Sequence, residues 1–379
     1  MLNYKAMFPR ACETCYLDTG AEGLPAPHTE EALLEYCRAK ASGTPGRRHL
    51  YAVAEETREL AARLLGAPPS SVAFMSHTSA ALNILSSSLD WQAGDEVVIS
   101  DLEFPSNVLP WLRLKQAGVR LIVVPGERGC VAWERIAERI STRTRLVSLS
   151  LVSYKTGAYL HSIPQLAAEA RRVGAILSID ATQALGRCPV SLEGVDYLMA
   201  SSYKWLLAPH GLAVVYLSPA LRERLQPAGV GWYSVANIFT PERFERYELK
   251  PGAECLTGGM PNFTSIYGMR EALRFLLDAG VQRISEDLSP LVHRLREGLS
   301  GMGLELLTPA GAEYASGIVS FAHPQAETLG VALERSGVVV WAGDGRVRAS
   351  LHLYNDAGDV DRYLDRLCGL LRGGGIADA

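Results

Sequence analysis

The topology of this chain is set by residues 176–217, which read ILSIDATQALGRCPVSLEGVDYLMASSYKWLLAPHGLAVVYL. The segment contains short runs of apolar and β-branched residues at 175–180, 197–200 and 211–217. Similar runs occur upstream at 71–75, 96–100, 120–124 and 145–152, with amphipathic stretches of helix length between them. Strands that alternate with helices predict βαβ units. We therefore expect an α/β protein with a mostly parallel, seven-stranded sheet that helices cover on both faces.

The pattern changes beyond about residue 250. Helical patterns at 265–279 and 281–302 are followed by weaker strands near 304–307, 317–321, 337–340 and 346–351, and by a last helix at 357–371. With 379 residues, the chain is long enough for two domains. We predict an N-terminal segment at 1–20 that packs on the small domain, a large domain at 21–250, and a smaller C-terminal α/β domain at 251–379, which ends in a Gly-rich tail.

The composition argues against several classes of function. The 37 basic and 41 acidic side chains give a formal charge of −4, which is unfavourable for binding nucleic acid. No apolar run approaches the roughly 18 residues that a membrane helix needs. The first ten residues also lack the apolar core of a signal peptide. We expect a cytoplasmic protein that binds neither nucleic acid nor a membrane.

The cysteines and lysines narrow the possible chemistry. Seven cysteines, an odd number, are scattered along the chain and do not form a disulfide framework. Cys12 and Cys15 form a C-x-x-C pair, but no second pair or nearby histidine completes a zinc site, so we expect no metal. Nothing marks Cys255 as reactive. An amine nucleophile has six candidates, which are Lys5, Lys40, Lys115, Lys155, Lys204 and Lys250.

Polar residues follow several of the predicted strands, at the edge where ligands of parallel sheets bind. The glycine patterns of dinucleotide sites and P-loops are absent. Instead, residues 76–79 (SHTS) lead into a helix, Asp180 ends a strand, and Lys204 stands between two apolar strands with little charge nearby. Each feature alone has an ordinary explanation, as a helix N-cap, a turn carboxylate or a loop lysine.

Together, these three features match the requirements of pyridoxal 5′-phosphate. Hydroxyls and free amides at a helix N-terminus bind phosphate. A carboxylate keeps the pyridinium nitrogen protonated, and a desolvated lysine with a lowered pKa holds the aldehyde as a Schiff base. We therefore predict pyridoxal 5′-phosphate as the cofactor, with Lys204 and Asp180 as catalytic residues.

The sequence resembles the class V aminotransferase and cysteine desulfurase family of fold-type I pyridoxal-phosphate enzymes. The resemblance runs from about residue 16 to 367 and is clearest at 178–211, at SDLEFPSNVLPW (100–111) and at VRASLHLYND (347–356). It implies the fold-type I architecture and a small-molecule amino-acid substrate, whose α-carboxylate Arg348 holds. Gln183 is then the donor to the ring hydroxyl, and Phe104 stacks on the ring. The implied phosphate ligands are Thr78, Ser79, Ser201 and Tyr203.

The resemblance also implies a homodimer with active sites at the interface. The stretch TGGMPN at 257–262 resembles a loop that reaches the phosphate of the other subunit, so Gly259 and Met260 are assigned to cofactor binding. Arg47 and His49 lie on the Gly/Pro-rich stretch SGTPGRRHLY, which we predict lines the entrance and binds a second acidic group of the substrate. A solvated run of charges explains the same residues equally well.

The chain departs from the desulfurases of this family at four positions. They carry a mobile cysteine on a loop shortly before the substrate arginine, whereas residues 337–346 (GVVVWAGDGR) contain none. Phe104 and Tyr203 replace histidines, and Tyr154 stands where many relatives have asparagine. These differences resemble the isopenicillin-epimerase-like or C–S lyase subgroup, so we expect no persulfide-forming desulfuration.

The residues select the cofactor but leave the reaction open. We favour β-elimination at a cysteine conjugate in specialised metabolism, with Lys204 as the general base and Tyr154, Tyr203 and Lys155 as groups that steer the outcome. Epimerisation, transamination and decarboxylation coupled to oxidative deamination remain alternatives. So do a non-catalytic relative that keeps the fold and a thiol-based metal or redox protein that uses Cys12 and Cys15.

Overall fold

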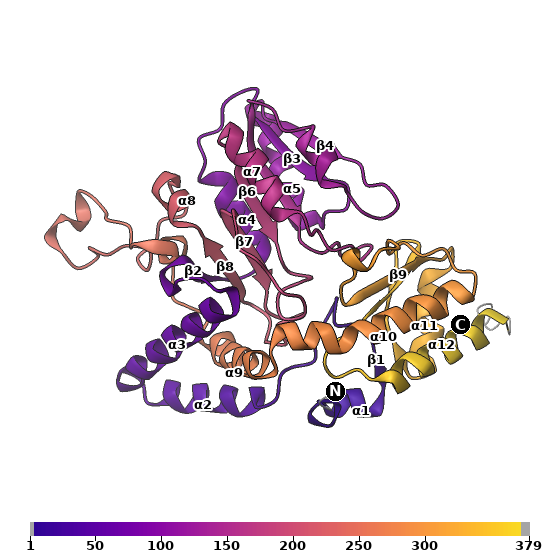
Figure 1. Cartoon of the computed structure of the whole chain (residues 1–379). Coiled ribbons are helices and arrows are strands. Elements are labelled where there is room, and N and C mark those ends of the chain that lie inside the picture. The colour runs from indigo at the N-terminus through magenta and orange to yellow at the C-terminus, as the bar shows by residue number, and fades with distance from the viewer. Residues whose placement is uncertain (1–3, 373–379) are drawn as a thin grey trace.

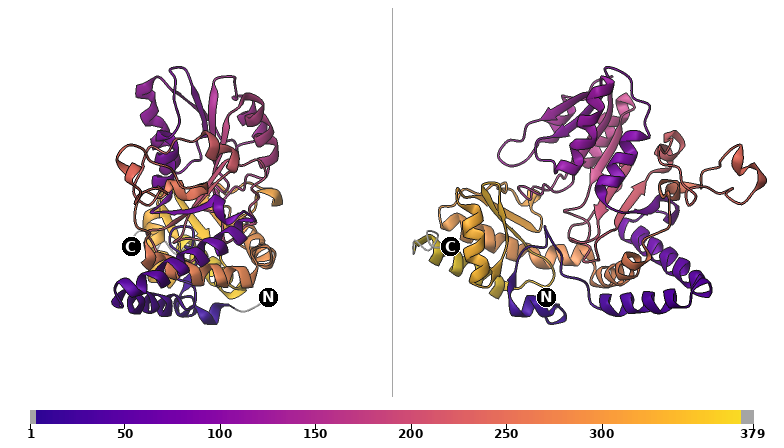
Figure 2. Two further views of the ribbon diagram at one scale, coloured as in Figure 1. Left: turned by 90° about the vertical axis from the view of Figure 1, so that its left-hand side faces the viewer. Right: turned by 180° about the vertical axis from the view of Figure 1, so that it is seen from behind.

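A computed structural model of the chain describes residues 4–372. Residues 1–3 and 373–379 lie outside the described part, and with them the start of the predicted N-terminal segment and the predicted Gly-rich tail. Figures 1 and 2 show a body built around a large sheet and a second, smaller body that contains the C-terminal helix.

The large body contains the predicted seven-stranded sheet, in the order β2-β8-β7-β6-β5-β3-β4. Its strands are β2 (Val72–Met75), β3 (Glu96–Ser100), β4 (Arg120–Val124), β5 (Thr144–Ser150), β6 (Ile176–Asp180), β7 (Tyr197–Ser201) and β8 (Ala213–Leu217). Only β8 runs against its neighbours, because it pairs antiparallel with both β2 and β7. The predicted α/β fold with a mostly parallel sheet is confirmed.

Apolar side chains leave the sheet on both faces, which explains why its strands read as continuous apolar runs. Leu146 and Tyr197 pack on one face with the helices α4 and α5. Their neighbours Val147 and Leu198 belong to the core on the other face, where α7 packs against β5 and β6.

The α-helices of the described residues are α1 (Pro9–Glu13), α2 (Thr29–Ala41), α3 (Arg47–Leu65), α4 (Thr78–Ser87), α5 (Leu109–Arg113), α6 (Trp133–Ala137), α7 (Ile163–Val173), α8 (Pro219–Arg224), α9 (Phe263–Ala279), α10 (Val281–Gly301), α11 (Ala326–Arg335) and α12 (Ala357–Arg372).

The smaller body is built on a three-stranded antiparallel sheet in the order β11-β12-β9. Its strands are β9 (Ile318–Ala322), β11 (Trp341–Gly343) and β12 (Arg346–Ser350). The strand expected near 304–307 is reduced to one bridge between Leu306 and Phe321, and the short β11 is an element that the sequence pattern did not indicate.

The N-terminal segment crosses between the bodies. The N-terminal strand β1 (Cys15–Tyr16) pairs with β10 (Val338–Val339), next to the small sheet. Helix α9 packs mainly on α2 and α3, so residues 263–279 lie on the large-domain side of the boundary predicted at 250. Arg47 and His49, which were predicted to line the entrance, lie in the first turn of α3, which begins directly after a Pro-Gly turn.

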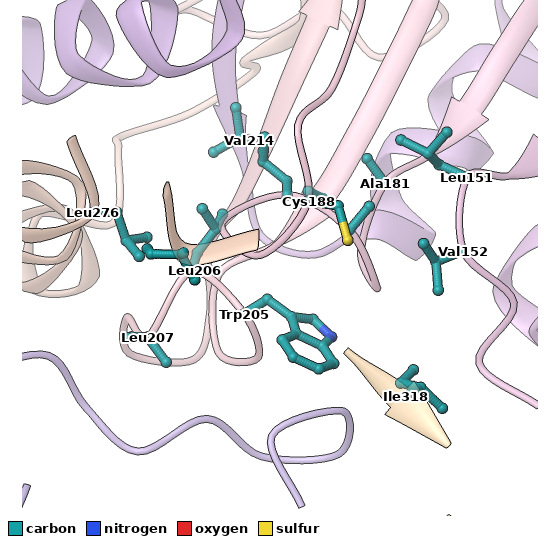
Figure 3. Packing of buried hydrophobic residues seen from close by; sticks show 14 of the residues in the cluster. Leu151, Val152, Ala181, Cys188, Trp205, Leu206, Leu207, Val214, Leu276 and Ile318 are labelled. Carbon is teal, nitrogen blue, oxygen red and sulfur yellow. The ribbon is translucent and has the colours of Figure 1, made fainter. Parts of the chain in front are cut away.

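Trp205 joins the two bodies through its buried indole ring. Figure 3 shows it among Leu206, Ala181 and Ile318, the last of which belongs to β9. Its Nε1 donates to Oε1 of Gln183 at 2.7 Å. Nδ1 of His352 accepts from the Leu353 amide, so Nε2 carries the ring proton and donates to the Trp205 carbonyl oxygen at 3.0 Å. Burial lowers the pKa of His352 to about 3, so its imidazole ring stays neutral.

Two absences in residues 4–372 bear on the predictions made above. No helix there is long and apolar enough to cross a membrane. No group of three or more histidine, cysteine, aspartate or glutamate side chains there is arranged to hold a metal ion. All seven cysteines are free; Cys12 is exposed, and the buried Sγ of Cys15 donates to the Asp359 carbonyl oxygen.

A glycine close to Lys204 provides a test of this arrangement. The Gly23 amide donates to the Tyr203 carbonyl oxygen at 2.8 Å, and a Cβ at Gly23 would lie 1.9 Å from the Lys204 carbonyl oxygen. We expect Gly23→Ala to destabilise the protein by about 1–3 kcal/mol or more, because backbone must move to make room. Gly301→Ala is the matched control, since a Cβ there has open space within 4 Å. Equal thermal unfolding midpoints for the two variants would contradict this packing.

Candidate functional site

A cavity of about 220 Å³ lies at the carboxyl ends of β2, β5, β6 and β7. Most of the site residues predicted from the sequence surround it, and five further residues complete its wall. It is lined by His77, Thr78, Ser79, Phe104, Ser106, Ser150, Val152, Tyr154, Asp180, Thr182, Gln183, Ser201, Tyr203 and Lys204. Five of these residues were not predicted, although each stands within four residues of a predicted one: His77, Ser106, Ser150, Val152 and Thr182.

Hydroxyl groups gather at one end of the cavity, where α4 begins. The His77 Nδ1 caps this helix by accepting from the Ala80 amide at 2.9 Å. The Thr78 and Ser201 hydroxyl oxygens are 3.3 Å apart, and those of Ser79 and Ser106 are 2.7 Å apart. Hydroxyls from two strand ends and a loop thus converge on the positive end of a helix dipole, which suits a phosphate dianion.

Asp180 ends β6 beside this cradle and is 6% exposed. Its Oδ1 accepts from the Thr182 amide at 2.8 Å. Burial raises the pKa of the Asp180 carboxyl, while the Thr182 hydrogen bonds and Lys204 oppose that rise. A cation placed against it would stabilise the ionised carboxylate, as the protonated nitrogen of a pyridine ring does.

Lys204 brings a largely buried amine to the same cavity. Burial lowers its pKa to about 8, with a further contribution from Arg348, while Asp180 and Asp18 act in the opposite direction. Its Nζ lies 5.4 Å from the Phe104 ring centroid and 5.6 Å from that of Tyr203. An amine in these surroundings is neutral over a far larger part of the physiological pH range than an ordinary lysine.

The aromatic residues of the site contact other aromatic rings, which fix their positions. Tyr154 meets Phe104 edge to face with ring centroids 5.1 Å apart, and Tyr203 stacks on His210. The loop that carries Phe104 is fixed by the buried Glu103, whose carboxylate accepts from Ser100, Asn107 and Ser150 side chains at 2.6–2.7 Å.

Gln183 lines the cavity and also makes two hydrogen bonds to other parts of the chain. Its Oε1 accepts from Trp205, and its Nε2 donates to the Gly20 carbonyl oxygen at 2.8 Å. An amide nitrogen has two hydrogens, so one remains for an oxygen on a bound ring. The role predicted for Gln183 thus stays compatible with its contacts.

Arg348 lies next to the cavity on β12 and is 3% exposed. Its Nη1 donates to the Tyr154 carbonyl oxygen at 3.0 Å, and its Nη2 is 3.6 Å from Oδ1 of Asp18. Burial lowers the pKa of Arg348 to about 10. Asp18 had not been predicted: it follows β1, and burial raises the pKa of its carboxyl to about 6 despite the nearby arginine.

Several predicted residues do not reach this cavity. His49 pairs with Glu35 at 2.9 Å on an exposed surface, and Arg47 is exposed at the start of α3. Met260 is 48% exposed and accepts a hydrogen bond from the Tyr51 hydroxyl, beside Gly259. Lys155 is half-buried and does not line the cavity. Their predicted roles find no support within a single chain.

The residues present fit pyridoxal phosphate. The cradle of hydroxyls matches the phosphate, Asp180 the ring nitrogen, and the neutral Lys204 amine the aldehyde.

Comparisons with known proteins agree with this geometry. The aminotransferase class-V family model matches residues 15–363. A probable cysteine desulfurase of Pyrococcus abyssi is 28% identical over 94% of this chain and 94% of its own. The structure of a cysteine desulfurase from Thermococcus onnurineus covers 97% of both chains with 26% identity and a TM-score of 0.89. The cystine C-S lyase C-DES, solved with cysteine persulfide, shares the fold at 21% identity and a TM-score of 0.87, covering 95% of this chain and 98% of its own.

The pKa of Lys204 predicts how the cofactor-free protein reacts. At pH 8 about half of the Lys204 amine is neutral, against about 0.3% of a lysine with its usual pKa of 10.5. Because the neutral amine is the nucleophile, the rate of reaction with pyridoxal phosphate should rise with pH through a midpoint near 8. Stopped-flow absorbance checks this, with Lys204→Ala as the control. A midpoint near 10.5 would show that the amine is not desolvated.

Proposed function

The chain belongs to the aminotransferase class-V family of pyridoxal-phosphate enzymes, and we propose that it cleaves the C–S bond of a cysteine conjugate by β-elimination. One observation favours elimination over the persulfide-forming reaction of a desulfurase. Strands β11 and β12 are joined only by Asp344 and Gly345, which leaves no loop for a mobile cysteine ahead of Arg348. The family site is kept, while the sulfur acceptor of a desulfurase is missing.

The substrate is held by its α-carboxylate. In this proposal Arg348 binds that carboxylate through a two-point contact, which the planar guanidinium favours. Asp18 and the Tyr154 carbonyl oxygen already fix the guanidinium from one side. The α-carbon of the substrate then lies between Arg348 and Lys204.

Bound pyridoxal phosphate supplies a protonated ring that accepts the electron pair released at the α-carbon. The Lys204 amine takes the proton from that carbon, which its lowered pKa permits near neutral pH. Asp180 holds the proton on the ring nitrogen. The sulfur leaves the β-carbon with its bonding electrons, and in this proposal Tyr154, which lines the cavity, donates a proton to it. The products are a thiol and 2-aminoacrylate, which tautomerises to an imine that water hydrolyses to pyruvate and ammonia.

We also propose that the protein is a cytoplasmic homodimer. Many of the large exposed apolar side chains belong to one segment, residues 230–260, and they are Val230, Trp232, Phe239, Phe244, Tyr247 and Met260. Figure 1 shows part of this segment as an arm that projects beyond α8. An arm with phenylalanines 89% and 83% exposed gains stability only against a partner.

The reaction is tested with S-substituted cysteines. The purified enzyme should release thiol and pyruvate in equal amounts, and Lys204→Ala should reduce the rate by at least about a thousandfold because it removes the base. Lys115→Ala, at an exposed site, serves as the control. Four other outcomes would contradict elimination and identify a different reaction. They are transfer of the amino group to a keto acid, loss of CO₂, exchange of the α-proton without product, and persulfide formation.

The dimer is tested through its arm. We expect the double variant Phe239→Asp, Phe244→Asp to sediment as a monomer, because two charges would be buried in the interface. Val331→Asp replaces an exposed apolar residue in α11 and should leave the assembly unchanged. If the arm variant remains a dimer with the same dissociation constant, the arm is not part of the interface.

A further inference from the structure

A second buried arginine lies beside Arg348. Arg346 is two residues earlier on β12, so both side chains leave the same face of the strand. Arg346 is 1% exposed, and its guanidinium carbon lies 4.5 Å from the Trp341 ring centroid. The guanidinium of Arg348 lies 5.2 Å from the same ring. Two cations therefore share one aromatic surface.

The pair borders the cavity through Tyr154. The Arg346 guanidinium carbon is 5.3 Å from the Tyr154 ring centroid, while Arg348 bonds the backbone of the same residue. Tyr154 itself lines the cavity that holds Lys204. Arg346 is therefore separated from the reacting centre by a single half-buried side chain.

The two arginines have few fixed anionic partners for buried cations. Arg348 faces Asp18 at 3.6 Å. Arg346 pairs with Asp344, whose side chain is 70% exposed at the turn between β11 and β12. The Nε atoms of both arginines are buried and have no hydrogen-bond partner among residues 4–372. Buried donors without acceptors are costly, so these atoms are the natural place for ligand oxygens.

We propose that Arg346 binds a second carboxylate, on the side chain of the substrate, while Arg348 binds the α-carboxylate. This inference rests on the proposed function, and it narrows the substrates to cysteine conjugates whose sulfur substituent ends in a carboxylate. The incoming carboxylate displaces Asp344, which returns to solvent at little cost because it is already exposed. Trp341 keeps the two guanidinium groups side by side.

An inert dicarboxylate tests this site without any chemistry. Isothermal titration of the cofactor-loaded enzyme should show that glutarate binds at least about tenfold more tightly than butyrate, because only glutarate reaches both arginines. Arg346→Gln should remove this preference by weakening glutarate alone. Arg294→Gln, an exposed arginine that pairs with Asp361, should change neither ligand. The result does not depend on C–S cleavage, so it stands or falls separately from the lyase assay.

A second variant keeps the test decisive if Arg346→Gln does not fold. Asp344→Asn removes the competing carboxylate from an exposed turn residue whose φ of 50° asparagine tolerates well. It should bind glutarate more tightly than the wild-type enzyme does and leave butyrate unchanged. Equal affinities for glutarate and butyrate in the wild-type enzyme would overturn the proposal. So would an equal loss of both ligands in Arg346→Gln, which would assign this arginine to structure alone.

Discussion

The buried turn at residues 203–207 is the constraint on which the site depends. Trp205 is fully buried, and it is tied to Gln183 through its indole and to His352 through its backbone. The amide of Gly23 bonds the turn at one end, and Ala26 bonds the Leu207 carbonyl oxygen at the other. Leu207 has a φ of 56°, a conformation that a leucine adopts only when its surroundings impose it. The large body, the N-terminal segment and the small body thus all fix the residue next to Lys204.

This arrangement makes the electrostatics of the site a property of the whole fold. Lys204 comes from the large sheet, Arg348 from the small one, and Asp18 from the N-terminal segment. Burial of each group works against its charge, and only their proximity offsets that cost. The result is an amine, a guanidinium and a carboxyl that all titrate closer to neutrality than usual. Such shifts are typical of sites that move protons.

The sequence indicated most of the large body, because a sheet buried on both faces leaves a simple signal of apolar runs. Most residues that line the cavity were also within reach, since each follows a strand end or belongs to a short motif. Asp18 and Arg346 were not, because they reach the site through contacts with residues more than 190 positions away, Asp18 with Arg348 and Arg346 with Tyr154. The three-residue β11 is too short to produce a periodic pattern. The start of α3 at Arg47 was not apparent from the sequence, because the glycines and the proline before it are typical of turns.

The threading of the N-terminal segment into the small body has a consequence for synthesis of the protein. Strand β1 pairs with β10, Asp18 bridges to Ser350, and Cys15 bonds a residue 344 positions away. On the ribosome, at about 5–20 residues per second, the first twenty residues wait on the order of tens of seconds for these partners. During the later part of that interval Lys204 has been synthesised and Arg348 has not. The desolvated amine is therefore made before the buried arginine beside it.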